Sequence, residues 1–378
     1  MKSSLRLITI AGIDIGVHYT WVFIFVVLSW ALARGFFPQL YPNWDTRSYW
    51  IAGVVAALLL FGSVLVHELA HSLVAKARGI KVHSITLFLF GGVSNLEEEP
   101  ERPIVEFAVS IVGPLSSLAL AGICWGLLQL VGNRQGMGAG ILTYLALVNT
   151  VLAVFNLLPG YPLDGGRVLR SIIWQRTGSL MRATNIAATV GRIMGWGLIA
   201  LGLLQAFSGN WGGLWLAFIG WFLSSSADSS RRELGMREQL KGVQVRDVMA
   251  ANPISISPDT TVASLVSNVF RRQVSRAVPV CQRDQTVGIA TVTDVKELPR
   301  EKWEDTPVSA IMTREPLHRV RPEDDLNTVM QLLTRHDVNQ VLVMDDTRCA
   351  GIVTRADILN YLQLSQELGP RAKGGRSV

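Results

Sequence analysis

The sequence predicts an α-helical polytopic membrane domain followed by an α/β domain built from two repeated units. The chain of 378 residues is 49% hydrophobic and only 17% charged, whereas an ordinary soluble domain has roughly 25% charged residues. Long apolar runs recur before about residue 226 and normal globular sequence follows, so the two parts are suited to different solvents. After residue 243 a segment of the sequence repeats itself.

The membrane domain is predicted to contain about six transmembrane helices. A helix needs roughly 20 residues to cross about 30 Å of hydrocarbon. Six apolar stretches approach this length, at residues 17–34, 50–75, 105–131, 139–158, 189–207 and 211–226. The last two are short or rich in glycine. The first stretch is longer than the apolar part of a signal peptide and lacks a small-residue cleavage site, so it is expected to be retained.

Basic residues predict the orientation of these helices. They collect before the first stretch and after the second, fourth and sixth, whereas the loops at 35–49 and 132–139 each hold a single arginine. Loops on the cytosolic side carry an excess of Lys and Arg. The N-terminus, the ends of the second and fourth helices and the whole C-terminal region are therefore expected in the cytosol.

A short segment between the second and third helices predicts a membrane-associated β element. Apolar residues nearly alternate from Ile80 to Leu89, and the run ends in Gly91-Gly92. This pattern is typical of a strand pair with a turn. Because open strand edges are not tolerated against lipid, the element must be covered by protein or line a wet cavity.

The charge and the cysteines exclude two other classes of protein. The net charge of +6 comes from basic residues at the ends of apolar stretches and in scattered positions, without a basic and aromatic patch, so no nucleic-acid partner is expected. Cys124, Cys281 and Cys349 are far apart and odd in number, so no disulfide framework is expected either.

The second apolar stretch contains the metal-binding pattern His67-Glu68-Leu69-Ala70-His71. Histidines four positions apart share one face of a helix and can both reach one zinc ion, which places Glu68 beside the metal. Zinc lowers the pKa of a bound water to about 7, and a neighbouring carboxylate can take its proton. The alternative is a pair of buried histidines satisfied by their neighbours, but ionisable residues inside a membrane are costly and commonly functional.

A catalytic zinc site usually has three protein ligands, so a third ligand is expected elsewhere in the chain. Asp164 is the best candidate, in the segment NLLPGYPLDGGR at residues 156–167. The fourth helix, which precedes this segment, is predicted to end on the same side of the membrane as the second. Both lines of argument place Asp164 at the level of the histidines.

These motifs resemble the site-2 protease family of intramembrane metalloproteases. The resemblance covers about residues 10–226 and rests on HELAH in a membrane helix, GPLSS at 113–117 and NLLPGYPLDGGR. It implies that His67, His71 and Asp164 bind one zinc ion and that Glu68 is the catalytic base.

The same family has an asparagine near its active site, and Asn149 lies at that point in the fourth stretch. Two interpretations of Asn149 stay open. It either holds an oxyanion or substrate, or it makes a plain interhelical hydrogen bond. Gly113-Pro114 is interpreted as a kink and a close-packing point rather than a catalytic feature.

The C-terminal repeats have an offset of 63 residues. The segment VRDVM at 245–249 recurs as VSAIM at 308–312, and GIATVTD at 288–294 recurs as GIVTRAD at 351–357. Mixed short strands and amphipathic helices predict two similar halves that bury a common face.

These repeats resemble a pair of CBS modules over about residues 245–364. The resemblance implies an adenine nucleotide, ATP, ADP or AMP, with aspartates on the ribose and threonines facing the phosphates. The matching residues are Thr291, Asp294, Thr354 and Asp357. The alternative that the pair is purely structural stays open. CBS pairs also often dimerise, which makes a homodimer through these domains a further hypothesis.

The predicted function is that of an intramembrane zinc metalloendopeptidase that carries out regulated intramembrane proteolysis. Its substrate is expected to be a single-span membrane protein, unwound near the cytosolic side and held by strand addition on the exposed strand near 85–89. The predicted divisions are a protease domain at 1–226, a basic linker at 227–243, repeats at 244–306 and 307–364, and a disordered tail at 365–378.

The alternative function is a CBS-regulated metal-ion transporter or channel. Such a protein could use the two histidines as the site of a transported metal. It needs no glutamate between its ligands, however, and no charged series runs through the apolar stretches.

Overall fold

The computed structural model describes residues 4–88, 91–96, 100–273, 276–283 and 285–368. The chain forms two compact units, Met1–Arg232 and Glu233–Val378. The boundary lies inside helix α8, Gly212–Leu240, so most of the predicted basic linker at 227–243 is helical.

Five helical segments in the described residues are long and apolar enough to cross a membrane. They are Thr20–Leu40, which joins α1 (Thr20–Ala31), a π-helical turn (Leu32–Phe36) and α2 (Phe37–Leu40), then α3 (Thr46–Ala77), α4 (Pro103–Leu130), α5 (Met137–Asn156) and α7 (Leu180–Phe207). They correspond to the first five predicted stretches. The sixth stretch is the start of α8, where polar sequence begins at Ser224. The apolar part before it is only about 18 Å long at 1.5 Å per residue, below the roughly 30 Å of hydrocarbon.

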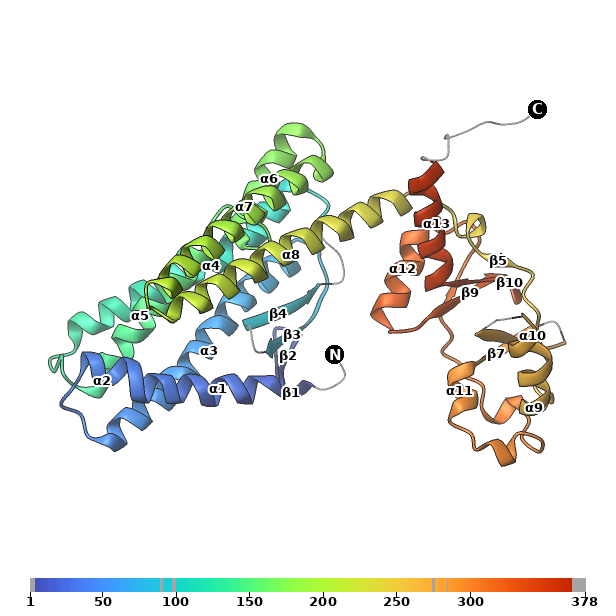
Figure 1. The fold of residues 1–378 in the computed structure, drawn as a ribbon, viewed down its shortest axis with the longest axis horizontal. Helices are drawn as coiled ribbons and strands as arrows, with labels where there is room; N and C mark the ends of the chain where they lie inside the picture. The colour runs from blue at the N-terminus through green and yellow to red at the C-terminus, as the bar shows by residue number, and fades with distance from the viewer. Residues whose placement is uncertain (1–3, 89–90, 97–99, 274–275, 284, 369–378) are drawn as a thin grey trace. The chain divides into compact units, whose positions relative to one another are not determined.

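The helices of the first unit pack as a bundle around α3 and α4. Helices α3, α4 and α5 contact one another, and the short helix α6 (Asp164–Thr177) packs on α4 and α7 (Figure 1). Small side chains allow the close approach of α1 to α3, since a Cβ added at Gly53 would lie 2.7 Å from the Ser29 carbonyl oxygen. Such small-residue contacts are typical of helix packing in membranes.

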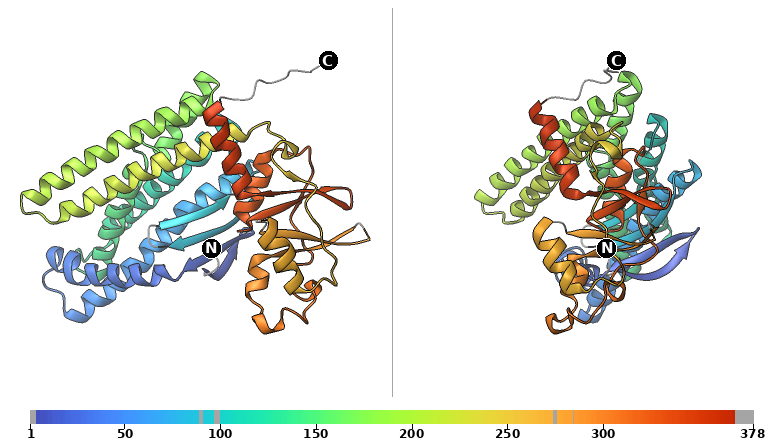
Figure 2. Two further views of the ribbon diagram at one scale, coloured as in Figure 1. Left: turned by 45° about the vertical axis from the view of Figure 1, so that its right-hand side comes forward. Right: turned by 90° about the vertical axis from the view of Figure 1, so that its right-hand side faces the viewer.

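A four-stranded sheet lies beside α3 in the order β1-β2-β3-β4 (Figure 2). Its strands are Ser4–Ile10, Ile13–His18, Val82–Phe88 and Gly91–Leu96. The predicted strand pair is present as β3 and β4. The N-terminal hairpin was not predicted. It turns at Ala11 and Gly12, whose φ angles are 51° and 75°, as a tight hairpin turn requires.

The strand near 85–89 is not the exposed edge that the sequence suggested. Strand β3 pairs in parallel with β2, with Ile15 opposite Ile85, and antiparallel with β4. Its backbone groups are therefore used on both sides, and the free edge next to α3 belongs to β4. Residue 89 lies outside the described residues.

The second unit contains two similar halves, in agreement with the 63-residue repeat. The first half has β6 (Ala277–Gln282), β7 (Gln285–Thr291) and α11 (Val292–Lys296), and the second has β9 (Gln340–Asp345), β10 (Arg348–Thr354) and α13 (Arg355–Leu368). Each half has its own apolar core, around Val278 and Val280 in the first and Val341 and Val343 in the second.

The remaining elements of the second unit are short. They are three 3-10 turns (Val245–Asp247, Arg300–Lys302 and Val308–Ala310), β5 (Ala250–Ala251), α9 (Val262–Leu265), a π-helical turn (Val266–Phe270), α10 (Arg271–Gln273), β8 (Arg319–Val320) and α12 (Leu326–Arg335).

Helix α13 ends at Leu368, four residues beyond the predicted end of the second repeat. The rest of the predicted tail, residues 369–378, lies outside the described residues.

Candidate functional site

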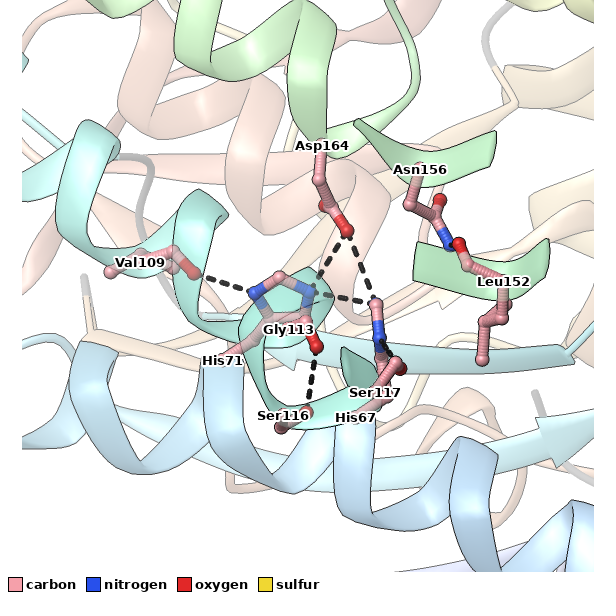
Figure 3. Close-up of polar contacts among 9 residues, drawn as sticks. All are labelled: His67, His71, Val109, Gly113, Ser116, Ser117, Leu152, Asn156 and Asp164. Carbon is pink, nitrogen blue, oxygen red and sulfur yellow. Dashed lines mark hydrogen bonds and ion pairs between the residues drawn. The ribbon is translucent and has the colours of Figure 1, made fainter. Parts of the chain in front are cut away.

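The structure brings His67, His71 and Asp164 together at one point (Figure 3). The two histidine Nε2 atoms lie 3.1 Å apart, and Asp164 Oδ2 lies 3.1 Å from that of His67 and 3.2 Å from that of His71. The histidines come from adjacent turns of α3, and the aspartate comes from a segment almost one hundred positions away. All three side chains are largely buried.

This arrangement fits a zinc ion. Four ligands at the usual zinc distances of 2.0–2.1 Å in a tetrahedron have their donor atoms about 3.3 Å apart, close to the separations in the cluster. The Nδ1 atom of His71 lies 2.6 Å from the Val109 carbonyl oxygen. Because a carbonyl only accepts, Nδ1 carries a hydrogen. A neutral ring then has its lone pair on Nε2, which faces the carboxylate oxygen. Lone pairs that converge in this way favour a cation between them.

One face of α4 supports both histidines. Val109, Gly113 and Ser117 follow one another at helical spacing, and the Ser117 hydroxyl lies 2.9 Å from His67 Nδ1. Hydrogen bonds to the second ring nitrogen orient metal-binding histidines in this way. A Cβ added at Gly113 would lie 2.2 Å from His71 Nε2 and 2.8 Å from His67 Nε2. Gly113 is therefore a close-packing point, as expected, and its neighbours are the two candidate ligands.

Asp164 is the first residue of α6, and the loop before it folds tightly onto the same helix. Cβ atoms added at Gly165 and Gly166 would lie 2.2 Å from Leu157 O and Tyr161 N, respectively. The two glycines of the DGG sequence thus permit the loop after α5 to pack closely on α6. This packing places the Asp164 carboxylate beside the histidines.

Glu68 lies against strand β4. A Cβ added at Gly92 would lie 2.4 Å from Glu68 Cγ, so the glycine leaves the space that this side chain occupies. The Ser72 and Ser94 hydroxyl oxygens are 2.9 Å apart and tie β4 to α3 one turn further along. The edge strand is therefore fastened beside the predicted base.

Asn149 is fully buried, and both hydrogens of its amide are used. They are donated to Ser63 Oγ at 3.1 Å and to Leu145 O at 2.9 Å. The bond to Ser63 joins α5 to α3, and the oxyanion or substrate role stays a prediction. Asn156 is a polar residue to which sequence reasoning assigned no role. It ends α5, directly before the loop to Asp164, and donates to Leu152 O (Figure 3).

In the second unit, Thr291 with Asp294 and Thr354 with Asp357 form the same local structure. Each aspartate Oδ2 accepts hydrogen bonds from the threonine backbone N–H and hydroxyl, at 2.8 and 2.9 Å in the first repeat and 2.9 and 2.7 Å in the second. The residues therefore cap α11 and α13. Because each threonine hydroxyl donates to its own aspartate, it is not free to donate to a phosphate in this arrangement.

A cavity of about 270 Å³ lies between the two repeats. Thr291 and Asp294 line it from the first repeat, and His318, Asn339 and Gln340 line it from the second. Thr354 and Asp357 do not line this cavity. In the sequence, the 63-residue offset relates Asp337 and Val338 of this cavity to residues 274–275, which lie outside the described residues.

Comparison with known protein families gives matches to both units. Residues 55–137 and 133–198 match the model of peptidase family M50. Residues 245–301 and 308–364 match the CBS domain. The first pair of ranges contains His67, His71 and Asp164, and the second contains the capping residues of both repeats.

Full-length relatives carry both parts. A Synechocystis protein named as a zinc metalloprotease is 36% identical over 376 residues, 97% of each chain. One from Mycobacterium tuberculosis, similarly named, is 34% identical over 96% of this chain and 94% of its own. The solved site-2 protease of Methanocaldococcus jannaschii matches at 31% identity with a TM-score of 0.43, over 60% of this chain and 94% of that one. The chain belongs to peptidase family M50, the site-2 protease family of zinc metalloproteases, in a form with a C-terminal CBS domain pair.

Proposed function

We propose that this metalloprotease cleaves peptide bonds of membrane-spanning substrates at the His67, His71 and Asp164 cluster, as in regulated intramembrane proteolysis. The observation that carries the proposal is the convergence of three ligand atoms within 3.2 Å beside a glutamate, between helices long enough to cross a membrane. This geometry does not favour the alternative function of a metal-ion transporter or channel, because transport requires no general base beside the metal ligands.

The residues of the chain have distinct tasks in the proposed reaction. A bound zinc ion would supply a Lewis acid and a water of lowered pKa. His67, His71 and Asp164 would hold the ion, and the α4 face orients the histidine rings. The Glu68 carboxylate accepts the proton of the attacking water and returns it to the leaving amide nitrogen, as general acid–base catalysis requires.

Strand β4 is proposed to bind the unwound substrate. Its free edge offers backbone hydrogen bonds to an extended segment, and Gly92 and Ser94 hold it next to Glu68 and Ser72. A substrate strand added there would run past the base. The distribution of Lys and Arg supports a site that faces the cytosol.

The cavity between the repeats is proposed to bind an adenine nucleotide that modulates proteolysis. Asp294 uses Oδ2 in the helix cap, so its Oδ1 is available in the described structure to accept from ribose hydroxyls. The apolar Ile289 and Leu317 also line the cavity and suit a base. By repeat symmetry, Thr354 and Asp357 would serve a second site.

Substitution of Glu68 by glutamine tests the proposed mechanism. Glu68→Gln is expected to keep one zinc per chain, because no ligand is changed, and to lose cleavage of a single-span protein reconstituted with it in liposomes. Bound zinc is measured by mass spectrometry and cleavage by gel. The control is Glu233→Gln on α8, an exposed glutamate paired with Arg237. Cleavage by Glu68→Gln at the native rate would rule out the proposed base.

A further inference from the structure

A buried ion pair between α4 and α6 lies outside the ligand cluster. The Arg170 Nε donates to Glu106 Oε1 at 2.6 Å, and a second guanidinium nitrogen contacts the same oxygen. The side chains are only 5% and 2% exposed. Burying two charges is costly, and such pairs are weak evidence for stability by themselves. The pair therefore calls for another explanation.

The two partners stand on the elements that must meet for the cluster to form. Glu106 lies one turn before Val109 on the α4 face that supports the histidines. Arg170 lies on α6, the helix that begins with Asp164. An ion pair between them fixes the position of α6 along α4, and hence the position of the Asp164 carboxylate relative to the histidine rings.

Arg170 also holds the loop that leads to Asp164. Its guanidinium carbon lies 5.0 Å from the centre of the Tyr161 ring, a distance at which a cation is attracted to the ring face. The Tyr161 backbone N–H donates to Ala187 O of α7 at 3.2 Å. Arg170 is thus a common contact of α4, α6 and the loop, and the loop is in turn attached to α7.

The geometry points to Glu106 and Arg170 as positioning residues for the third zinc ligand. They set the helix register and loop position that keep Asp164 within reach of the metal, without contacting substrate or metal themselves. This inference rests on the proposed zinc site.

Release of zinc from the full-length protein in detergent tests this role. The informative variant is Glu106→Leu with Arg170→Met, because replacing both members of a buried pair by apolar residues is often neutral or stabilising. It is expected to fold, with a zinc-free melting temperature near the native one, and to release zinc into excess chelator about 10- to 100-fold faster, the usual effect of losing an outer-shell partner.

The matched control is Arg192→Met on α7. Arg192 pairs with Asp228 at 3.8 Å, and both side chains are near 40% exposed, so this variant is expected to release zinc at the native rate. Native release from the folded double variant would overturn the inference. Equal acceleration in Arg192→Met would overturn it too, since the effect would then be general.

Asp164→Ala separates the inference from the proposal beneath it. Loss of zinc in Asp164→Ala with native release in the double variant would refute the positioning role alone. Stoichiometric, tightly held zinc in Asp164→Ala would refute the metal site and the inference together. Loss of zinc in Asp164→Ala together with faster zinc release from the double variant would support both the metal site and the positioning role.

Discussion

Gly113 leaves room for the candidate zinc ligands because it has no side chain. Its α-carbon faces both histidine Nε2 atoms, and any side chain there would occupy the space between α4 and the ligands. The hydrogen bonds of Val109 O and Ser117 Oγ fix the rings from the same helix face. One face of α4 thus provides the space at Gly113 and the two hydrogen-bonding partners of the histidine rings. The geometry of the site depends on all three.

Gly113→Ala is expected to weaken zinc binding on the order of 10- to 100-fold, because the added carbon would lie 2.2 Å from His71 Nε2. Bound zinc after dialysis against graded chelator measures the effect. Gly122→Ala on the same helix is the matched control. A Cβ there meets nothing within 4 Å, and alanine in a helix interior is favoured over glycine by roughly 0.5–1 kcal/mol. Equal zinc affinity in the two variants would contradict the packing argument.

At the residue scale, the sequence indicates the candidate ligands for a local reason. The spacing in HELAH is set by the helix itself, so any helix there places His67 and His71 on one face. The supporting residues do not follow from spacing, because Val109 acts through its backbone carbonyl and Gly113 through absence of a side chain. Neither carries a chemical signal in the sequence.

At the scale of secondary-structure elements, local sequence patterns predict two strands of the β sheet but not how the strands pair. The alternation at 80–92 predicts β3 and β4, and both are present. The parallel pairing of β3 with β2 joins segments about seventy positions apart, and no local pattern indicates such a contact. That pairing uses the edge of β3 and leaves β4 as the free edge beside Glu68.

Gly92→Ala is expected to lower cleavage by about 10²-fold, the order expected when a catalytic group is misplaced by about 1 Å. The added Cβ would lie 2.4 Å from Glu68 Cγ and displace the carboxylate. Zinc content should stay native, since the three atoms nearest to this carbon all belong to Glu68. Cleavage and zinc content are both measured on the protein in liposomes.

Gly62→Ala on α3 serves as the control, because a Cβ at Gly62 meets nothing within 4 Å. It should cleave at the native rate. If Gly92→Ala kept full cleavage, the base would not lie against β4 in the working enzyme. If it lost zinc together with cleavage, the change would have reached the ligands and the separate role of Glu68 would be refuted.

At the scale of the whole molecule, two compact units each have their own apolar core. The sequence predicts this division because the composition changes from apolar to mixed and a repeat begins. It does not predict that Asp294 lines a cavity. Asp294 and Asp357 cap their helices in the same way, and tertiary contacts with the second repeat form the described cavity beside Asp294.

The last prediction concerns that cavity. An adenine nucleotide is expected to raise the unfolding temperature of the second unit in the full-length protein. A ligand at about 100 times its Kd stabilises a protein by about 2.7 kcal/mol, which amounts to a shift of several degrees for a domain of this size. ATP, ADP and AMP are compared at millimolar concentration, by thermal unfolding and by calorimetry.

Asp294→Ala and Asp357→Ala form a matched pair for this measurement. Each removes one capping interaction of about 1 kcal/mol, so their unfolding temperatures without ligand should fall alike. Only Asp294 lines the described cavity, so only Asp294→Ala should remove the binding there, whereas Asp357→Ala should retain it. The effect of nucleotide on proteolysis must likewise vanish in Asp294→Ala. If no nucleotide binds the native protein, the cavity has another ligand or none, and if binding survives in Asp294→Ala, the nucleotide is recognised elsewhere on the chain.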